Sequence, residues 1–119
     1  MCEALDRWSQ AFKEERNTLI KKRAEVYDTC HEEMAQAMSM EMGAPFGMNQ
    51  SSQIGAGTWH LQDFLQAFVD LSFENDFAAT ERTLRELIGV CAMITTWNRS
   101  MNQITLMALQ VIATGSIAI

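Results

Sequence analysis

The chain has 119 residues, a mass of 13.4 kDa, a formal net charge of −6 and 48% hydrophobic residues. An acidic chain lacks the basic surface with which proteins bind nucleic acid or an anionic membrane, so neither is an expected partner. The hydrophobic content is too high for a disordered chain, and no apolar run reaches the ~18 residues of a transmembrane helix. We therefore expect one domain, residues 1–119, with a single core.

Three cysteines, Cys2, Cys30 and Cys91, are an odd number without the close spacing of a disulfide framework or a zinc site. His31 lacks the second histidine of a zinc-binding helix, so no metal site is expected. The first residues also lack the basic and apolar regions of a signal peptide. These features together favour a reducing, cytoplasmic location.

Residues 1–45 are predicted to form one helix or a pair of helices. Apolar residues recur at the spacing of one helical face: Leu5, Trp8, Phe12, Leu19, Val26, Cys30, Met34 and Met38. Gly43 suits the left-handed end of a helix, and Pro45, the only proline, cannot continue it. A bend between residues 11 and 17 is left open by the pattern.

A second helical segment is predicted for residues 51–72, where Ser51 or Ser52 can cap the first turn by accepting a hydrogen bond from a free amide. Gly55 and Gly57 weaken that turn and permit a close approach of another backbone. One side of this helix is apolar, through Ile54, Leu61, Phe64, Leu65, Phe68, Val69 and Leu71.

Residues 87–119 are predicted to form an incomplete β-α-β unit. The eight apolar residues 87–94 are typical of a strand buried on both faces, with a buried helix as the alternative. Helical spacing returns over 101–114, and 116–119 starts another apolar strand, which is the order of a parallel crossover. The preceding stretch, 73–86, is ambiguous, with a turn expected at Asn75 and Asp76. The expected fold class is mainly α with a minor β part.

Several strings resemble the N-terminal region of bacterial aldehyde dehydrogenases: EMAQAMSMEMGAP at 33–45, IGVCAMITTWN at 88–98 and MNQITL at 101–106. The resemblance extends from about residue 4 to residue 119. It implies N-terminal helices followed by the first piece of an incomplete dinucleotide-binding α/β domain. For the parent enzyme it implies NAD- or NADP-dependent oxidation of an aldehyde to a carboxylic acid, through a cysteine nucleophile and a glutamate that activates water.

The resemblance also implies roles for residues in one loop. Asn98 matches the family asparagine whose side-chain amide helps form the oxyanion hole. Ile94, Thr95 and Trp97 match the loop that lines the cofactor cleft at the carboxyl end of the first strand. The family's catalytic cysteine and glutamate match no residue of this stretch, and Cys91 is expected to be a buried apolar residue instead of a nucleophile.

The sequence departs from the family pattern at several positions. Thr96 stands where the family has a proline, which frees the backbone of the loop. Phe12 stands where a Ser or Thr would cap the second helix, and the stretch 73–85, which leads in the family into an arm for subunit assembly, is shortened.

We therefore expect an aldehyde dehydrogenase-like fragment that has no activity and no cofactor of its own. Open strand edges favour a homo-oligomer, or refolding of the C-terminal third as helix, and full-length aldehyde dehydrogenase subunits are further expected partners. Two alternatives are retained binding of a nicotinamide dinucleotide near Trp97 and Asn98, and a split dehydrogenase whose other part is a separate chain.

Overall fold

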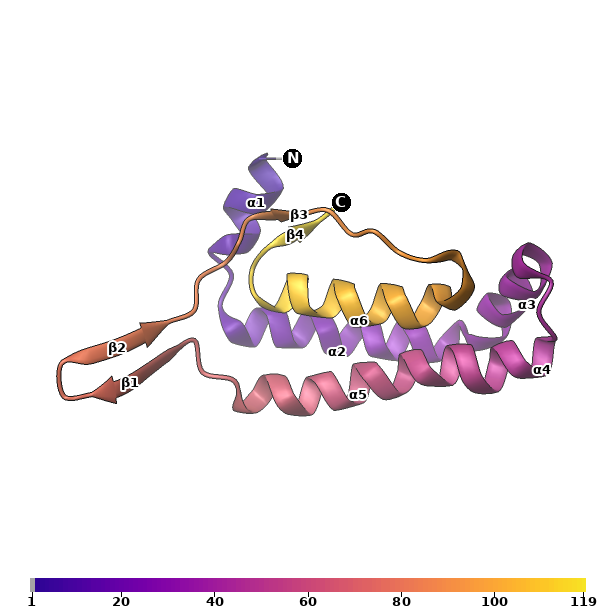
Figure 1. Ribbon diagram of the computed structural model, residues 1–119, viewed down its shortest axis with the longest axis horizontal. Coiled ribbons are helices and arrows are strands. Elements are labelled where there is room, and N and C mark those ends of the chain that lie inside the picture. Colours follow the sequence, from indigo (N-terminus) through magenta and orange to yellow (C-terminus); the bar gives the residue numbers. More distant parts are fainter. Residues whose placement is uncertain (1) are drawn as a thin grey trace.

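The computed structural model describes residues 2–119, with side chains from residue 3 onward. Met1, where the predicted segment 1–45 starts, and the side chain of Cys2 lie outside that description. The helices are α1 (Cys2–Ser9), α2 (Lys13–Thr29), α3 (His31–Met42), α4 (Phe46–Met48), the π-helical turn Asn49–Ile54, α5 (Gly55–Asp70), the 3-10 turn Trp97–Arg99 and α6 (Ser100–Ala113). The strands are β1 (Glu74–Ala78), β2 (Glu81–Leu84), β3 (Val90–Cys91) and β4 (Ile117–Ala118). The mainly α fold class is confirmed (Figure 1).

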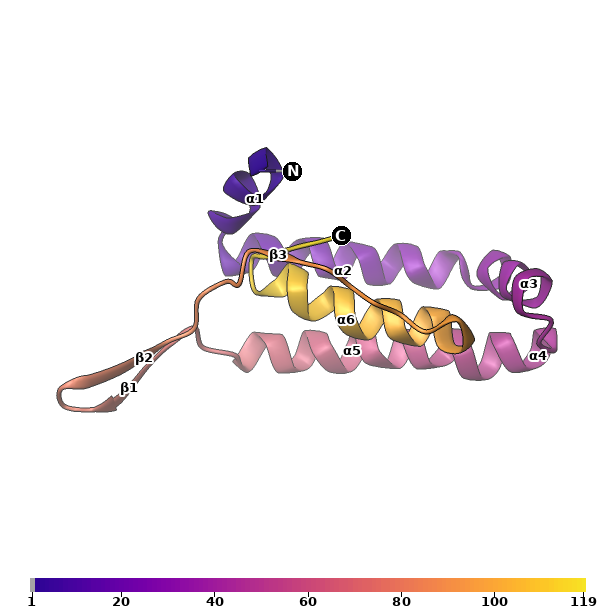
Figure 2. The same cartoon turned by 45° about the horizontal axis from the view of Figure 1, so that its top comes forward.

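Helices α2, α5 and α6 lie side by side and enclose the main core (Figure 2). The centre of this core is formed by Ile20, Leu61, Phe68, Leu109 and Ala113. A smaller cluster of Ala35, Met38 and Ile54 joins α3 to the π-helical turn. None of the described helices is both long and apolar enough to cross a membrane.

The apolar face predicted for the stretch that forms α2 is not the face that enters the core. Phe12, Leu19 and Val26 are 74%, 36% and 54% exposed, whereas Ile20 on the neighbouring face is completely buried and Tyr27 packs against the core. Because α2 carries few apolar residues, their spacing does not distinguish two adjacent faces. Toward its N-terminal end the buried face of α2 carries Lys13 and Arg16, which are half-buried.

Lys13, in the first turn of α2, binds the C-terminal end of α5. Its ammonium group donates hydrogen bonds to the carbonyl oxygens of Val69 and Leu71, at 2.8 and 2.6 Å. The same group lies 5.4 Å from the ring centroid of Phe68. These carbonyls have no partner within the helix, so a cation here satisfies them and complements the helix dipole.

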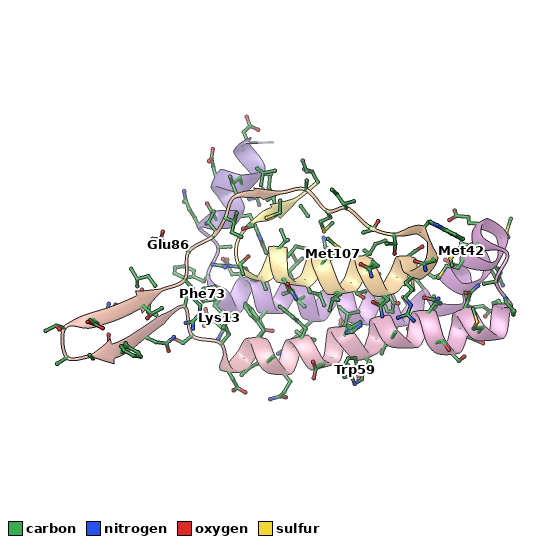
Figure 3. The ribbon with its side chains drawn as sticks, in the orientation of Figure 1. Lys13, Met42, Trp59, Phe73, Glu86 and Met107 are labelled. Carbon is green, nitrogen blue, oxygen red and sulfur yellow. The ribbon has the colours of Figure 1, made fainter. Side chains whose placement is uncertain are left out.

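Arg16, one turn further along α2, does the same for α6. Its Nη1 donates to the carbonyl oxygen of Ala113 at 2.9 Å, and its guanidinium lies 5.4 Å from the Phe73 ring centroid. Gly115 has a φ of +87°, and a Cβ added there would lie 3.0 Å from Nη1. Glycine is therefore favoured by the positive φ, and a Cβ would in addition make a tight contact with the arginine (Figure 3 shows Lys13 and Phe73 in this region).

The helical conformation is interrupted twice within the N-terminal segment, so that it forms three helices, α1, α2 and α3. Between α1 and α2, Phe12 is extended and its N–H donates to the carboxylate of Glu15 at 3.0 Å, so the second helix is capped without a Ser or Thr. A second break falls at Cys30, between α2 and α3. The expected helix end at Gly43 is confirmed by its φ of 70°.

The predicted cap at Ser51 or Ser52 is wrong, because helical conformation already begins at Phe46 and both serines lie inside it. Gly57 does permit a close approach, but of the Tyr27 ring and not of a backbone. The Tyr27 hydroxyl donates to the carbonyl oxygen of Ile54 at 3.0 Å. This bond joins α2 to the π-helical turn.

The ambiguous stretch 73–86 forms an antiparallel hairpin of β1 and β2 that projects away from the helices (Figure 1). The turn expected at Asn75 and Asp76 is wrong, since both residues lie in β1 and the chain turns at residues 79–80. Arg82 bonds the carboxylates of Asp76 and Glu74 on the facing strand, at 3.0 and 3.2 Å.

Strands β3 and β4 pair in parallel on either side of α6 in the sequence, which confirms the β-α-β order. The expectation of a strand buried on both faces over 87–94 is wrong. Only Val90–Cys91 are strand, and Ile88 and Ile94 are 88% and 89% exposed. Within the described chain β4 is the only neighbour of β3, so no further strand covers its other edge. Refolding of this third entirely as helix does not occur.

Replacing Lys13 by Met should lower the free energy of unfolding by about 2 kcal/mol, because two carbonyls at the end of α5 lose a charged donor. Urea denaturation followed by circular dichroism measures this. Lys21→Met, at an exposed position of the same helix, is the matched control and should change stability by less than about 0.5 kcal/mol. Equal losses in the two variants would contradict the capping role.

Burial, and then the charge of Asp28, raises the pKa of Tyr27 to about 12 from its usual 10.0. Below pH 10 the phenol is protonated in both the folded and the unfolded chain, and the stabilisation by the protonated Tyr27 is fully present. Between pH 10 and about 12 the unfolded chain releases this proton first, so the contribution is lost. The melting temperature should therefore fall less steeply over this window in Tyr27→Phe than in the unaltered chain. Identical slopes would contradict the assignment.

Candidate functional site

The four predicted site residues lie in one loop that runs from the end of β3 to the start of α6 (Figure 1). Ile94 and Thr95 follow the strand, and Trp97 and Asn98 belong to the 3-10 turn that leads into the helix. This is the carboxyl end of a parallel strand, where such sheets bind ligands. The structure thus brings the four residues together beside the N-terminus of α6.

The backbone of this loop is held by neighbouring helices. The Ser100 hydroxyl donates to the carbonyl oxygen of Trp97 at 3.2 Å and lies 4.0 Å from the sulfur of Met42, near the end of α3 (Figure 3). Gln53 donates to the carbonyl oxygen of Asn98 at 3.4 Å. The side-chain amide of Asn98 forms no hydrogen bond to any described residue, so it is available to a ligand.

The loop is open to solvent. All four residues are exposed, with Ile94 at 89% and Trp97 at 78%. A groove of about 1050 Å³ lies between α1, α2, α6 and β4, and none of the four residues lines it. Oxyanion stabilisation depends on a site from which water is excluded. The four exposed residues do not by themselves enclose a ligand.

Cys91 is half-buried within β3 and has a free thiol. The two histidines belong to α3 and α5, and α3 lies at the opposite end of the helical body from β3 (Figures 1 and 2). A thiol nucleophile needs a nearby base or cation, and no described residue of this kind bonds to Cys91. Within residues 2–119 no three His, Cys, Asp or Glu side chains are arranged to hold a metal ion.

A polar cluster that sequence reasoning missed joins α2, α3 and α5. The Thr58 hydroxyl lies 2.9 Å from Nε2 of His31 and 3.2 Å from a carboxylate oxygen of Asp28. Asp28 also lies 3.2 Å from the same Nε2. Both partners use one ring nitrogen, so the aspartate does not orient the imidazole from its other nitrogen as a catalytic triad requires. The i,i+3 spacing of Asp28 and His31 was visible in the sequence, whereas Thr58 is brought in only by the fold.

Comparisons with a family model, with known sequences and with solved structures all match this chain to aldehyde dehydrogenases. The model of the aldehyde dehydrogenase family matches residues 2–119. The chain is 34% identical over 113 residues to a 3-succinoylsemialdehyde-pyridine dehydrogenase of a Pseudomonas species, which covers 94% of this chain and 24% of that protein. Its structure matches the crystal structure of an aldehyde dehydrogenase from Bartonella henselae with a TM-score of 0.93 and 31% identity, over 98% of this chain and 25% of the other.

A second solved structure, a variant of aldehyde dehydrogenase C from Pseudomonas syringae in complex with NAD+ and octanal, matches with a TM-score of 0.91 and 33% identity. The match covers 98% of this chain and 24% of that one. The chain therefore spans about a quarter of the length of these relatives. The match to the family model over nearly every residue establishes that the chain belongs to the aldehyde dehydrogenase family.

Proposed function

We propose that this chain is the N-terminal structural part of an NAD(P)-dependent aldehyde dehydrogenase and does not oxidise aldehydes by itself. The observation that carries the proposal is the position of Asn98. Its unbonded side-chain amide lies in an exposed loop at the carboxyl end of a parallel strand, beside the start of α6. Two hydrogen bonds restrain the backbone of the loop, one from Ser100 to the Trp97 carbonyl and one from Gln53 to the Asn98 carbonyl.

The chemistry assigned to Asn98 is electrostatic. When a thiolate attacks the carbonyl carbon of an aldehyde, negative charge develops on the carbonyl oxygen, and a side-chain N–H donor stabilises that charge. The thiolate and the carboxylate that activates water come from the polypeptide that completes the enzyme, in the same chain or in a separate one. Without that polypeptide, Asn98 is exposed to solvent and has no oxyanion to stabilise.

Ile94, Thr95 and Trp97 are assigned to one side of the cofactor cleft of the completed enzyme. Binding of NAD or NADP by the isolated chain is not favoured, because these residues are exposed and none lines the large groove. The free thiols of Cys30 and Cys91 suit a reducing compartment, so we place the protein in the cytoplasm.

We further propose that the chain acts through association, as a homo-oligomer or with full-length aldehyde dehydrogenase subunits. Large apolar side chains are exposed on several elements, including Ile88, Ile94 and Ile119 around the parallel strand pair. One edge of β3 carries no strand within the described residues, and open edges accept further strands. Contact with another polypeptide removes this surface from water.

A chimera tests the role of Asn98. Residues 2–119 replace the matching quarter of aldehyde dehydrogenase C from Pseudomonas syringae, without the substitution of the solved variant, and oxidation of octanal is followed by the absorbance of NADH. In this chimera Asn98→Ala should lower kcat by about 10²- to 10³-fold, the usual cost of removing an oxyanion donor. Asn75→Ala, an exposed position in the hairpin, is the matched control and should leave kcat unchanged.

The isolated chain is the negative control of the same assay and should form no NADH. Aldehyde-dependent NADH formation by the isolated chain would contradict the proposal. So would an active chimera in which Asn98→Ala and Asn75→Ala have equal rates.

A further inference from the structure

The outward face of α2, with the extended residue Phe12 that precedes its first turn, carries five residues in a symmetric order, which we name the outer stripe: Phe12, Glu15, Leu19, Arg23 and Val26. Relative to Leu19 they stand at −7, −4, 0, +4 and +7. At about 100° per residue the four helical members fall within an arc of about 80° on one side of the helix, and Phe12 directly precedes its first turn. This is the face predicted for the core, and the structure leaves it open, with the three apolar side chains 74%, 36% and 54% exposed.

The order of the stripe is self-complementary. Turning a second copy of α2 by 180° about an axis through Leu19 places its Val26 against Phe12 and its Arg23 against Glu15. Each apolar residue then meets an apolar residue, and each charge meets its opposite, twice by symmetry. We propose that the outer stripe is the interface through which two copies of this chain pair, with their α2 helices antiparallel.

The charges of the stripe are free for this contact. Glu15 accepts the Phe12 N–H at the start of the helix, and neither it nor Arg23 takes part in an ion pair among the described residues. A carboxylate has two oxygens, so Glu15 keeps acceptor capacity for a guanidinium from the second copy. The net charge of −6 would otherwise oppose pairing, which makes the two matched ion pairs important for orientation.

Apolar surface continues beside the stripe. Glu15, Leu19 and Arg23 also line the groove of about 1050 Å³, whose other wall is α6 with Ile104 and Ile112. Ile104 is 44% exposed there. Residues of α1 and β4 also line this groove, so apolar surface borders the stripe along α2.

A second copy explains the pattern better than an unrelated partner does. An unrelated helix could use any arrangement of charges, whereas pairing about a twofold axis requires opposite charges at equal distances on either side of an apolar centre. The inference rests on the proposed association of the chain and specifies its surface and its partner.

Light scattering during size-exclusion chromatography tests the interface, with circular dichroism to confirm that each variant is folded. At ~50 μM the unaltered chain should have twice the monomer mass of 13.4 kDa. Leu19→Glu places two carboxylates on the axis and should give the monomer mass. Val69→Glu, on α5 at a residue that is also 54% exposed, is the matched control and should remain a dimer.

Charge reversal gives an independent readout. Glu15→Arg and Arg23→Glu should each weaken self-association by about tenfold or more, because both symmetric pairs become repulsive. Mixed in equal amounts, the two variants should restore the dimer as a heterodimer, and Glu25→Arg, on another face of α2, should have no effect. These results would hold even if Leu19→Glu failed to fold.

A monomeric unaltered chain would overturn the inference together with the homo-oligomer in the proposed function. A dimer that Leu19→Glu and the charge reversals leave unchanged would overturn the outer stripe alone and leave association intact. Neither result affects the role of Asn98, which is tested in the chimera.

Discussion

The structure depends on how α2 completes a core for which it has too few apolar residues. Ile20, Ala24 and Tyr27 supply its apolar contacts, and the ammonium group of Lys13 and the guanidinium of Arg16 lie over the rings of Phe68 and Phe73. Their charged ends bond the carbonyls at the ends of α5 and α6. One turn of α2 therefore fixes the ends of both other long helices.

This arrangement decides what the chain offers chemically. Because α6 is held at its C-terminal end by Arg16 and packs along α5, the loop at its N-terminal end has a fixed position. The loop presents Asn98 and the residues assigned to a cofactor cleft, yet nothing in the described chain covers it. The same segment is a quarter of its relatives' length, which accords with a site that has one wall.

Much of the fold could be predicted, because its signals are local. The helix end at Gly43 and the order of strand, helix and strand in 87–119 follow from glycine, proline and apolar runs. The errors concern long-range packing. Nothing local indicates that Lys13 caps α5, or that Tyr27 rests on Gly57. The strand over 87–94 was predicted as buried because apolar composition indicates burial but not whether neighbouring strands exist. The site residues came from family resemblance, and their roles stay predictions.

Hydrogen exchange of backbone amides in the isolated chain tests most directly whether the helical body is stable without a covering wall for the loop. The account predicts strongest protection around Ile20, Leu61 and Leu109, and little over residues 94–98, where the loop is exposed. Protection of the loop equal to that of the three helices, or rapid exchange throughout α2, α5 and α6, would contradict it.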